Sequence, residues 1–124
     1  MTIIGIDHVQ IAAPRGCEDD ARSFYGGLLG MVELRKPEAI RARGGCWFAA
    51  GAQELHVGVE EPFAPARKAH PGLLVSDLEA VRGRLAGAGV VFSDDAKIDG
   101  VERLFVDDPF GNRLELRAAA ARMV

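Results

Sequence analysis

The alternation of hydrophobic and polar residues predicts one order of elements in the first half of the chain. A run rich in β-branched residues over 3–13 predicts a strand. Apolar residues at helical spacing over 18–29 predict an amphipathic helix that ends at Gly30. Three shorter strands are then expected, over 31–36, 45–50 and 53–59.

The same order returns after a connector over 60–69, EEPFAPARKA, which contains two prolines and no periodicity. A short apolar strand is predicted at 70–75, and Asp77 is placed to cap a helix that Gly89 ends. Three more strands are predicted over 90–93, 101–106 and 113–117, the last two joined by the turn sequence DDPFGN. The pattern therefore predicts an α+β fold, a single domain made of two βαβββ modules at about residues 1–60 and 70–124.

Composition narrows the class of protein. The 124 residues, 48% of them hydrophobic, are enough for one domain with a compact core. The net charge of −3 with no basic stripe argues against a nucleic-acid partner, and no apolar run approaches the roughly 20 residues that span a bilayer. Two cysteines outside any CxxC arrangement are expected to be reduced thiols, and we expect a cytoplasmic protein with no membrane partner.

Two His-to-Glu pairs are the main candidates for chemistry. Glu54 follows His8 by 46 positions, and Glu115 follows His70 by 45 positions. A duplicated unit would place these four side chains around a pseudo-twofold axis. Neutral imidazoles beside carboxylates suit a divalent ion such as Mn²⁺, Fe²⁺, Co²⁺, Ni²⁺ or Zn²⁺. The simpler interpretation is that these are polar residues on the solvent face of half-buried strands.

Glu54 and His56 compete for one ligand position because they share a strand face. The sequence ELH in the first half parallels ELR in the second, which favours Glu54, whereas His56 is the better ligand by residue type. Whichever side chain is not the ligand is expected to line the pocket or contact the ligand.

Four segments carry a resemblance to a known family: DHVQIAA, ARSFYGGLLGM, HPGLLVSDLEAV and FVDDPFGNRLEL. They resemble the vicinal oxygen chelate superfamily, which includes glyoxalase I, methylmalonyl-CoA epimerase, fosfomycin-resistance proteins, bleomycin-binding proteins and extradiol dioxygenases. The resemblance covers nearly the whole chain and implies two βαβββ modules whose curled sheets form a cup. In this superfamily the cup is commonly completed in a homodimer, which the resemblance therefore implies here.

The resemblance assigns metal ligands to His8 on the first strand, Glu54 on the fourth, His70 on the fifth and Glu115 on the last. One departure from the family pattern is Pro71, directly after His70, because a proline without an N–H group favours an edge or the start of a strand. Such a position would turn the imidazole of His70 away from a shared ion.

The function implied by the resemblance is that of a small metal-dependent lyase, isomerase or transferase acting on an oxygen-rich small molecule, with Glu115 or Glu54 as the base. The alternative is a metal-free protein that sequesters a drug or metabolite, as bleomycin-resistance proteins do. Ring-cleaving dioxygenases are usually much longer chains. Further candidates for the pocket are arginines that could recognise an anion and aromatic residues that could form a wall: Arg35, Arg41, Arg43, Arg103, Trp47, Phe48 and Phe105.

Overall fold

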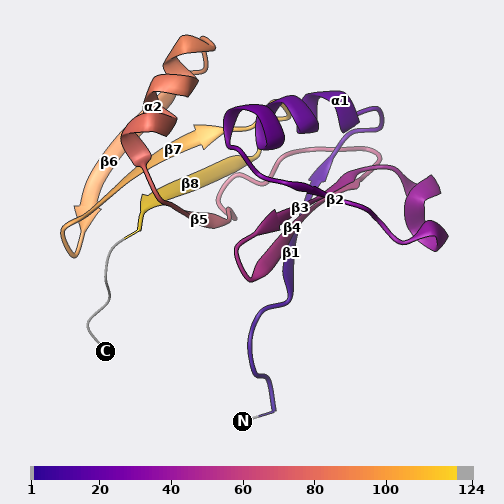
Figure 1. The fold of residues 1–124 in the computed structure, drawn as a ribbon. Helices are drawn as coiled ribbons and strands as arrows, with labels where there is room; N and C mark the ends of the chain where they lie inside the picture. The colour runs from indigo at the N-terminus through magenta and orange to yellow at the C-terminus, as the bar shows by residue number, and fades with distance from the viewer. Residues whose placement is uncertain (1, 120–124) are drawn as a thin grey trace. The chain divides into compact units, whose positions relative to one another are not determined.

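The computed structural model describes residues 2–119, and the chain divides into two compact units, residues 1–65 and 66–124. Each unit holds one four-stranded mixed sheet and its own helical segment (Figure 1). The predicted α+β fold of two βαβββ modules is confirmed. The boundary between the units falls inside the predicted connector, after Pro65.

The first unit has the strand order β1-β4-β3-β2, in which β1 and β4 run parallel and the other pairs run antiparallel. Its elements along the chain are β1 (His8–Ala13), α1 (Glu18–Ala21), η1 (Arg22–Leu28), β2 (Glu33–Leu34), η2 (Glu38–Arg43), β3 (Cys46–Ala50) and β4 (Gln53–Val59).

Strand β1 begins at His8 and not at Ile3, where the apolar pattern begins. The backbone N–H of Glu54 donates to the carbonyl of Asp7 at 3.3 Å, and β4 begins only one residue before Glu54. Residues 2–6 therefore have no strand to pair with, although Ile3 and Ile4 are apolar. The hydropathy pattern identified the strand, but the length of its partner determines where it begins.

The predicted first helix is present, but its second part is wider than an α-helix. After α1, segment η1 has π-helical hydrogen bonding, and the N–H of Leu29 donates to the carbonyl of Phe24, five residues earlier. Gly26 and Gly27 lie in this segment, where they weaken the preference for a regular α-helix. The buried ring of Tyr25 lies 5.5 Å from the ring of Phe48, which packs η1 against β3.

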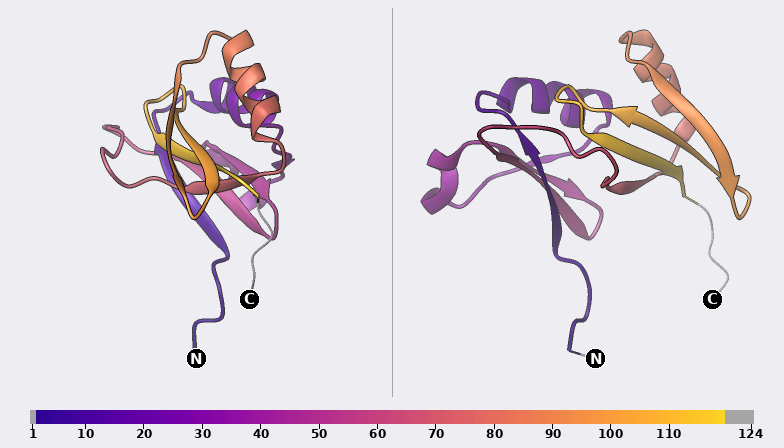
Figure 2. Two further views of the ribbon diagram at one scale, coloured as in Figure 1. Left: turned by 90° about the vertical axis from the view of Figure 1, so that its left-hand side faces the viewer. Right: turned by 180° about the vertical axis from the view of Figure 1, so that it is seen from behind.

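The second unit has the strand order β5-β8-β7-β6, with β5 and β8 parallel and the other pairs antiparallel (Figure 2). Its elements are β5 (Gly72–Val75), α2 (Leu78–Gly87), β6 (Phe92–Ile98), β7 (Val101–Asp107) and β8 (Arg113–Ala118). Helix α2 packs against β8, so the core of this unit lies between the helix and one face of the sheet. Its buried residues are Leu78, Val81, Leu85, Leu104, Val106, Leu114 and Leu116.

Both predicted ends of helix α2 are confirmed. The carboxylate of Asp77 accepts a hydrogen bond from the backbone N–H of Ala80 at 3.1 Å, an N-cap that typically contributes about 1 kcal/mol. After the helix, Gly89 has a φ of +72°, the left-handed conformation that ends many helices.

Two turns determine the shape of the hairpins in the second unit. Between β6 and β7, Asp99 (φ 51°) and Gly100 (φ 75°) form a tight turn, so β6 runs past its predicted end at residue 93 to Ile98. An Asp-Gly pair is a strong hairpin signal, and it was present in the sequence. Between β7 and β8, one carboxylate oxygen of Asp108 accepts from the backbone N–H groups of Phe110 (2.9 Å) and Asn112 (2.8 Å). The DDPFGN sequence thus fixes the turn that sets the register of β8.

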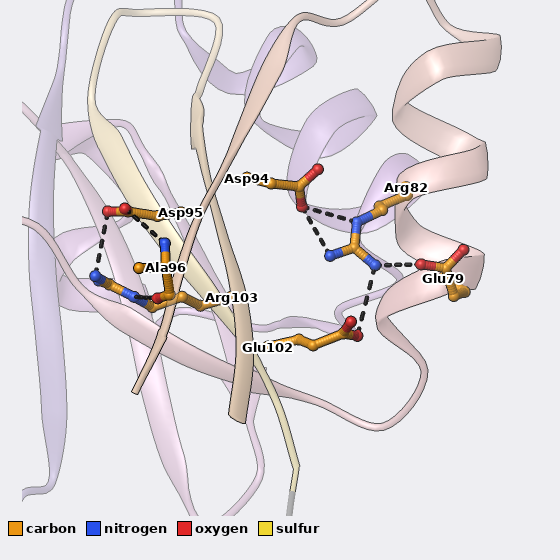
Figure 3. A network of polar contacts seen from close by, with 7 residues as sticks. All are labelled: Glu79, Arg82, Asp94, Asp95, Ala96, Glu102 and Arg103. Carbon is orange, nitrogen blue, oxygen red and sulfur yellow. Dashed lines mark hydrogen bonds and ion pairs between the residues drawn. The ribbon is translucent and has the colours of Figure 1, made fainter. Parts of the chain in front are cut away.

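A network of ion pairs ties α2 to its sheet through Arg82 (Figure 3). This guanidinium contacts Glu79 on the same helix, Asp94 on β6 at 2.7 Å and Glu102 on β7 at 3.8 Å. Hydrogen bonding and charge from Asp94 raise the pKa of Arg82 above its usual value, against the opposing effect of burial. We assign this cluster a structural role, because it joins three elements around one cation.

No helix within residues 2–119 is long and apolar enough to cross a membrane.

Candidate metal centre

The first unit brings His8 and Glu54 together. The parallel register of β1 and β4 places them directly opposite one another, and it places Gln10 opposite His56. On the other side of β4, Trp47 of β3 also pairs with His56. These side chains share the sheet face that points away from the buried core, since successive residues of a strand alternate between faces.

Three rings are stacked across this face. The ring of Trp47 lies 3.9 Å from that of His56 with 2° between their planes, and His56 lies 4.1 Å from His8 with 14° between planes. The Nε2 atom of His56 is 2.9 Å from Oε1 of Glu54. His56 is buried, with 6% of its side chain exposed against 39% for Glu54. The stack therefore holds His56 rigidly beside a more accessible carboxylate.

The ring stack limits the choice between Glu54 and His56. An imidazole binds a metal through a lone pair in its ring plane, at about 2.0–2.1 Å for zinc. Two nearly parallel rings 4.1 Å apart cannot both direct such lone pairs at one ion. If His8 is a ligand, this arrangement favours Glu54 as its companion and His56 as the group that orients Glu54.

Each histidine has one ring nitrogen held by an oxygen. Nδ1 of His8 lies 2.8 Å from a carboxylate oxygen of Asp7, and Nδ1 of His70 lies 2.8 Å from the backbone carbonyl of Lys68. Metal-binding histidines usually donate their second ring nitrogen to such an oxygen, which fixes the tautomer. The contacts leave Nε2 of His8 and of His70 as the nitrogens suited to bind an ion.

In the second unit, Glu115 on β8 lies opposite Gly72 of β5 and Phe105 of β7. Its side chain is 12% exposed, and Oε1 accepts a hydrogen bond from Nη1 of Arg103 at 2.6 Å. A Cβ atom at Gly72 would lie 3.3 Å from Oε2 of Glu115. The absence of a side chain at Gly72 therefore leaves room for the carboxylate.

The strand predicted over 70–75 begins only at Gly72, so His70 lies two residues before β5, on the other side of Pro71. Its exposed ring meets the ring of Phe105 edge to face, with 5.4 Å between centroids. The register pairs residues 46 positions apart in the first unit but 43 apart in the second, so Gly72 occupies the place opposite Glu115. The similar His-to-Glu spacings thus conceal a difference in register between the two pairs.

The donor set matches the chemistry of a divalent ion in kind, with two imidazoles and two carboxylates. Among residues 2–119, however, no group of three or more His, Cys, Asp or Glu side chains lies close enough to hold a metal ion. Each unit by itself offers a pair of candidate ligands.

Of the candidate arginines, Arg103 is in direct contact with the predicted ligand Glu115. Nη1 of Arg103 contacts Glu115. Nη2 contacts Asp95 at 3.2 Å and Nε donates to the carbonyl of Ala96 at 3.0 Å (Figure 3). Arg103 and Arg113 also lie near the ring of Phe105, 5.3 and 4.0 Å from its centroid.

Phe48 is wholly buried and belongs to the core, so it does not line a pocket. Burial also raises the pKa of both thiols, that of Cys17 to about 11, which makes them poor nucleophiles at neutral pH.

Sequence reasoning missed two features of these strand faces. The ring stack requires Trp47 and His56 to be cross-strand partners, which depends on the register of β3 and β4. The second feature is the environment of Arg117, two residues after Glu115, which depends on which residue of β7 lies opposite it. The alternation of β8 did place Arg113, Glu115 and Arg117 on one face, but only the pairing shows what surrounds them.

Comparison with known proteins identifies a matching family and similar solved structures. The model of the Glyoxalase/Bleomycin resistance protein/Dioxygenase superfamily matches residues 5–116. A solved structure from Bacillus anthracis, described as a glyoxalase family protein, is 48% identical, with 97% of this chain and 98% of that chain covered and a TM-score of 0.91. No curated protein sequence matches the chain significantly.

Two more distant structures share the fold. Lactoylglutathione lyase from Agrobacterium tumefaciens is 18% identical, with 96% of each chain covered and a TM-score of 0.72. A genomically encoded fosfomycin resistance protein from Listeria monocytogenes is 12% identical, again with 96% of each chain covered, and has a TM-score of 0.75.

Proposed function

Because the chain belongs to the Glyoxalase/Bleomycin resistance protein/Dioxygenase superfamily, we propose that it is a metal-dependent enzyme of this type, a lyase, isomerase or transferase acting on a small oxygen-rich substrate. One protein of the same fold supports an enzymatic role, since it is a lactoylglutathione lyase. Fold alone does not define an activity, so the proposal depends on the candidate ligands.

The observation that carries the proposal is the direct apposition of His8 and Glu54 on adjacent strands. An imidazole with its second nitrogen held by Asp7 and a partly exposed carboxylate are suited to bind one divalent ion. We propose that His70 and Glu115 complete the set, either within one chain or in a homodimer in which the two pairs come from different subunits.

The chemistry of the reaction would be shared between the ion and the carboxylates. A bound divalent ion would act as a Lewis acid toward two neighbouring substrate oxygens. Glu54 and Glu115 each have one carboxylate oxygen bonded to a nitrogen, of His56 and Arg103 respectively. In each case the other oxygen is available either to bind the ion or to accept a proton from the substrate, so one of the two residues would be the general base.

One observation favours the alternative function, a metal-free protein that sequesters a small molecule. The guanidinium of Arg103 already provides a cation to Glu115 at 2.6 Å. A metal ion at Glu115 would have to share this carboxylate with Arg103 or use Oε2 alone. The two functions differ in whether the protein binds a metal at all.

Titration of chelator-treated protein with Co²⁺ tests this difference. We expect saturable binding of one ion per chain, with the visible absorption bands of Co²⁺ bound to nitrogen and oxygen ligands, because the two pairs together supply a four-ligand set. A parallel titration with Ni²⁺ and Mn²⁺ compares other ions of the same class. If none of these ions binds saturably, the proposal of a metal-dependent enzyme is wrong and that of a sequestering protein remains.

Two substitutions at His56 test its role as the group that orients Glu54. In His56→Gln the amide N–H can still donate to Glu54, whereas His56→Phe keeps an aromatic ring between Trp47 and His8 but has no donor. We expect His56→Phe to weaken Co²⁺ binding by about tenfold or more, because it removes the hydrogen bond that orients the ligand Glu54. The Co²⁺ affinity of His56→Gln should stay within about threefold of that of the unmodified protein.

The same pair of variants distinguishes the other assignment. If His56 is itself the ligand, both substitutions abolish the Co²⁺ absorption bands, because an amide and a phenyl ring each remove the coordinating nitrogen. Circular dichroism spectra of the variants serve as the control for folding.

A further inference from the structure

Arg117 on β8 has an unusual environment for an arginine. It is half-buried, and its Nε atom is buried without a hydrogen-bond partner in the part of the chain that the structure describes. Buried polar groups in proteins nearly always have a partner, so an unpaired one needs a physical explanation. Within residues 2–119, no acidic side chain lies within ion-pair distance of this guanidinium.

The residue directly opposite Arg117 on β7 is another arginine, Arg103. Side chains opposite one another on antiparallel strands are about 4.5–5.5 Å apart at Cβ, and like charges in this arrangement are destabilising. Arg103 is compensated by Asp95 and Glu115. Arg117 has no ion-pair partner among residues 2–119, although the two arginines and the two carboxylates together carry no net charge.

The arginine pair lies beside the candidate metal ligand of the same unit. Glu115 is two residues before Arg117 on the same strand face, and it accepts a hydrogen bond from Arg103. Two residues before Glu115, Arg113 lies over the ring of Phe105 at 4.0 Å. The guanidinium groups of Arg103, Arg113 and Arg117 therefore lie near Glu115 on β7 and β8, and that of Arg117 has no ion-pair partner among residues 2–119.

We propose that Arg103 and Arg117 bind an anionic group, a carboxylate or a phosphate, on the small molecule that this protein recognises. An anion between the two guanidinium groups would accept hydrogen bonds from the Nη atoms of Arg117 and offset the repulsion between like charges. The inference rests on the proposed function in one respect, that this molecule also presents its oxygens to the site at Glu115. The substrate class is then a small oxygen-rich anion.

The test measures anion binding to chelator-treated protein, so that it does not depend on a metal. Inorganic phosphate and malonate are titrated separately at constant ionic strength, and the side-chain Nε–H signals of the arginines are followed in ¹H–¹⁵N spectra. We expect saturable binding of one anion with a shift of the Arg117 signal. Phosphate binding identifies a phosphate-bearing ligand, and malonate binding identifies a carboxylate-bearing one.

Three variants make the test specific. Arg117→Met removes the guanidinium and is expected to raise the Kd for the anion by at least about tenfold, because it removes charge-assisted hydrogen bonds. Arg117→Lys keeps the charge but not the planar fork and is expected to lose part of the affinity; it serves in place of Arg117→Met if that variant does not fold. Arg84→Met is the matched control, since Arg84 is exposed on α2, and its affinity should stay within about twofold.

Two results would overturn the inference: no saturable binding of either anion to the unmodified protein, or unchanged affinity in a folded Arg117 variant. These results are distinct from failure of the proposed metal site. Anion binding without Co²⁺ binding would contradict the proposed metal-dependent enzyme but support the anion site. Co²⁺ binding without anion binding would support the metal site and contradict the anion site.

Discussion

Replacement of His8 by alanine is expected to raise the Kd for Co²⁺ by at least about 100-fold and to remove its absorption bands. His8 is the accessible imidazole of the first unit, it lies directly opposite Glu54, and Asp7 holds its other ring nitrogen. Loss of a residue that only contacts a ligand costs about 10–100-fold in metal affinity, so loss of a ligand itself should cost more. The measurement is a Co²⁺ titration followed by absorption.

The matched control is Gln10→Ala, on the same strand and the same face as His8. Gln10 lies opposite His56 and offers no imidazole nitrogen, so this variant should bind Co²⁺ within about threefold of the unmodified protein. Equal Co²⁺ affinity in His8→Ala and the unmodified protein would show that the ion binds elsewhere. Equal loss in both variants would point to general damage to β1.

Replacement of Gly45 by alanine is expected to lower the free energy of unfolding by about 3 kcal/mol or more. Gly45 is buried at a φ of +85°, and a Cβ atom there would lie 2.0 Å from the backbone carbonyl oxygen of Val57. Its N–H also donates to a carboxylate oxygen of Glu18 at 2.6 Å, which lowers the pKa of that carboxyl. The added methyl group must displace backbone at the junction of β3 and β4. Urea denaturation followed by circular dichroism measures the change.

Gly83→Ala is the control for this substitution. Gly83 lies in the interior of α2, and a Cβ atom there would meet no heavy atom within 4 Å. Alanine favours a helix over glycine by about 0.5–1 kcal/mol, so this variant should be unchanged or slightly more stable. If both variants unfold at the same urea concentration as the unmodified protein, the chain at Gly45 is more adaptable than its geometry indicates, and the prediction is wrong.

The fold could be predicted largely because its elements depend on local patterns. Strand β4 has the bounds expected from the sequence, and the cap at Asp77 and the terminating Gly89 both act as their residue types predict. The last residues of β1 and β5 agree with the prediction, but their first residues do not, because β1 begins only where β4 can pair with it and β5 begins after Pro71. The short helix η2 was also missed, since its residues show no periodicity.

The candidate site could be predicted only in part. Alternation along the strands was sufficient to place Glu54 and His56 on one face, and similar spacings of 46 and 45 residues suggested a pairing of histidine with glutamate in each half. The register is a property of two strands together, and it places Gly72, not His70, opposite Glu115. The contacts of Arg103 with Glu115 and of His56 with Glu54 depend on side-chain packing that no residue pattern expresses.

The stacked rings of the first unit give the protein an internal optical reporter. Trp47 is the chain's sole tryptophan, and its indole lies in van der Waals contact with the imidazole of His56. Indole emission is sensitive to whatever stacks on it, so all intrinsic tryptophan fluorescence of this molecule originates next to His56, the residue that contacts the Glu54 carboxylate. A change at that carboxylate is thereby converted into a change of emission without any added label.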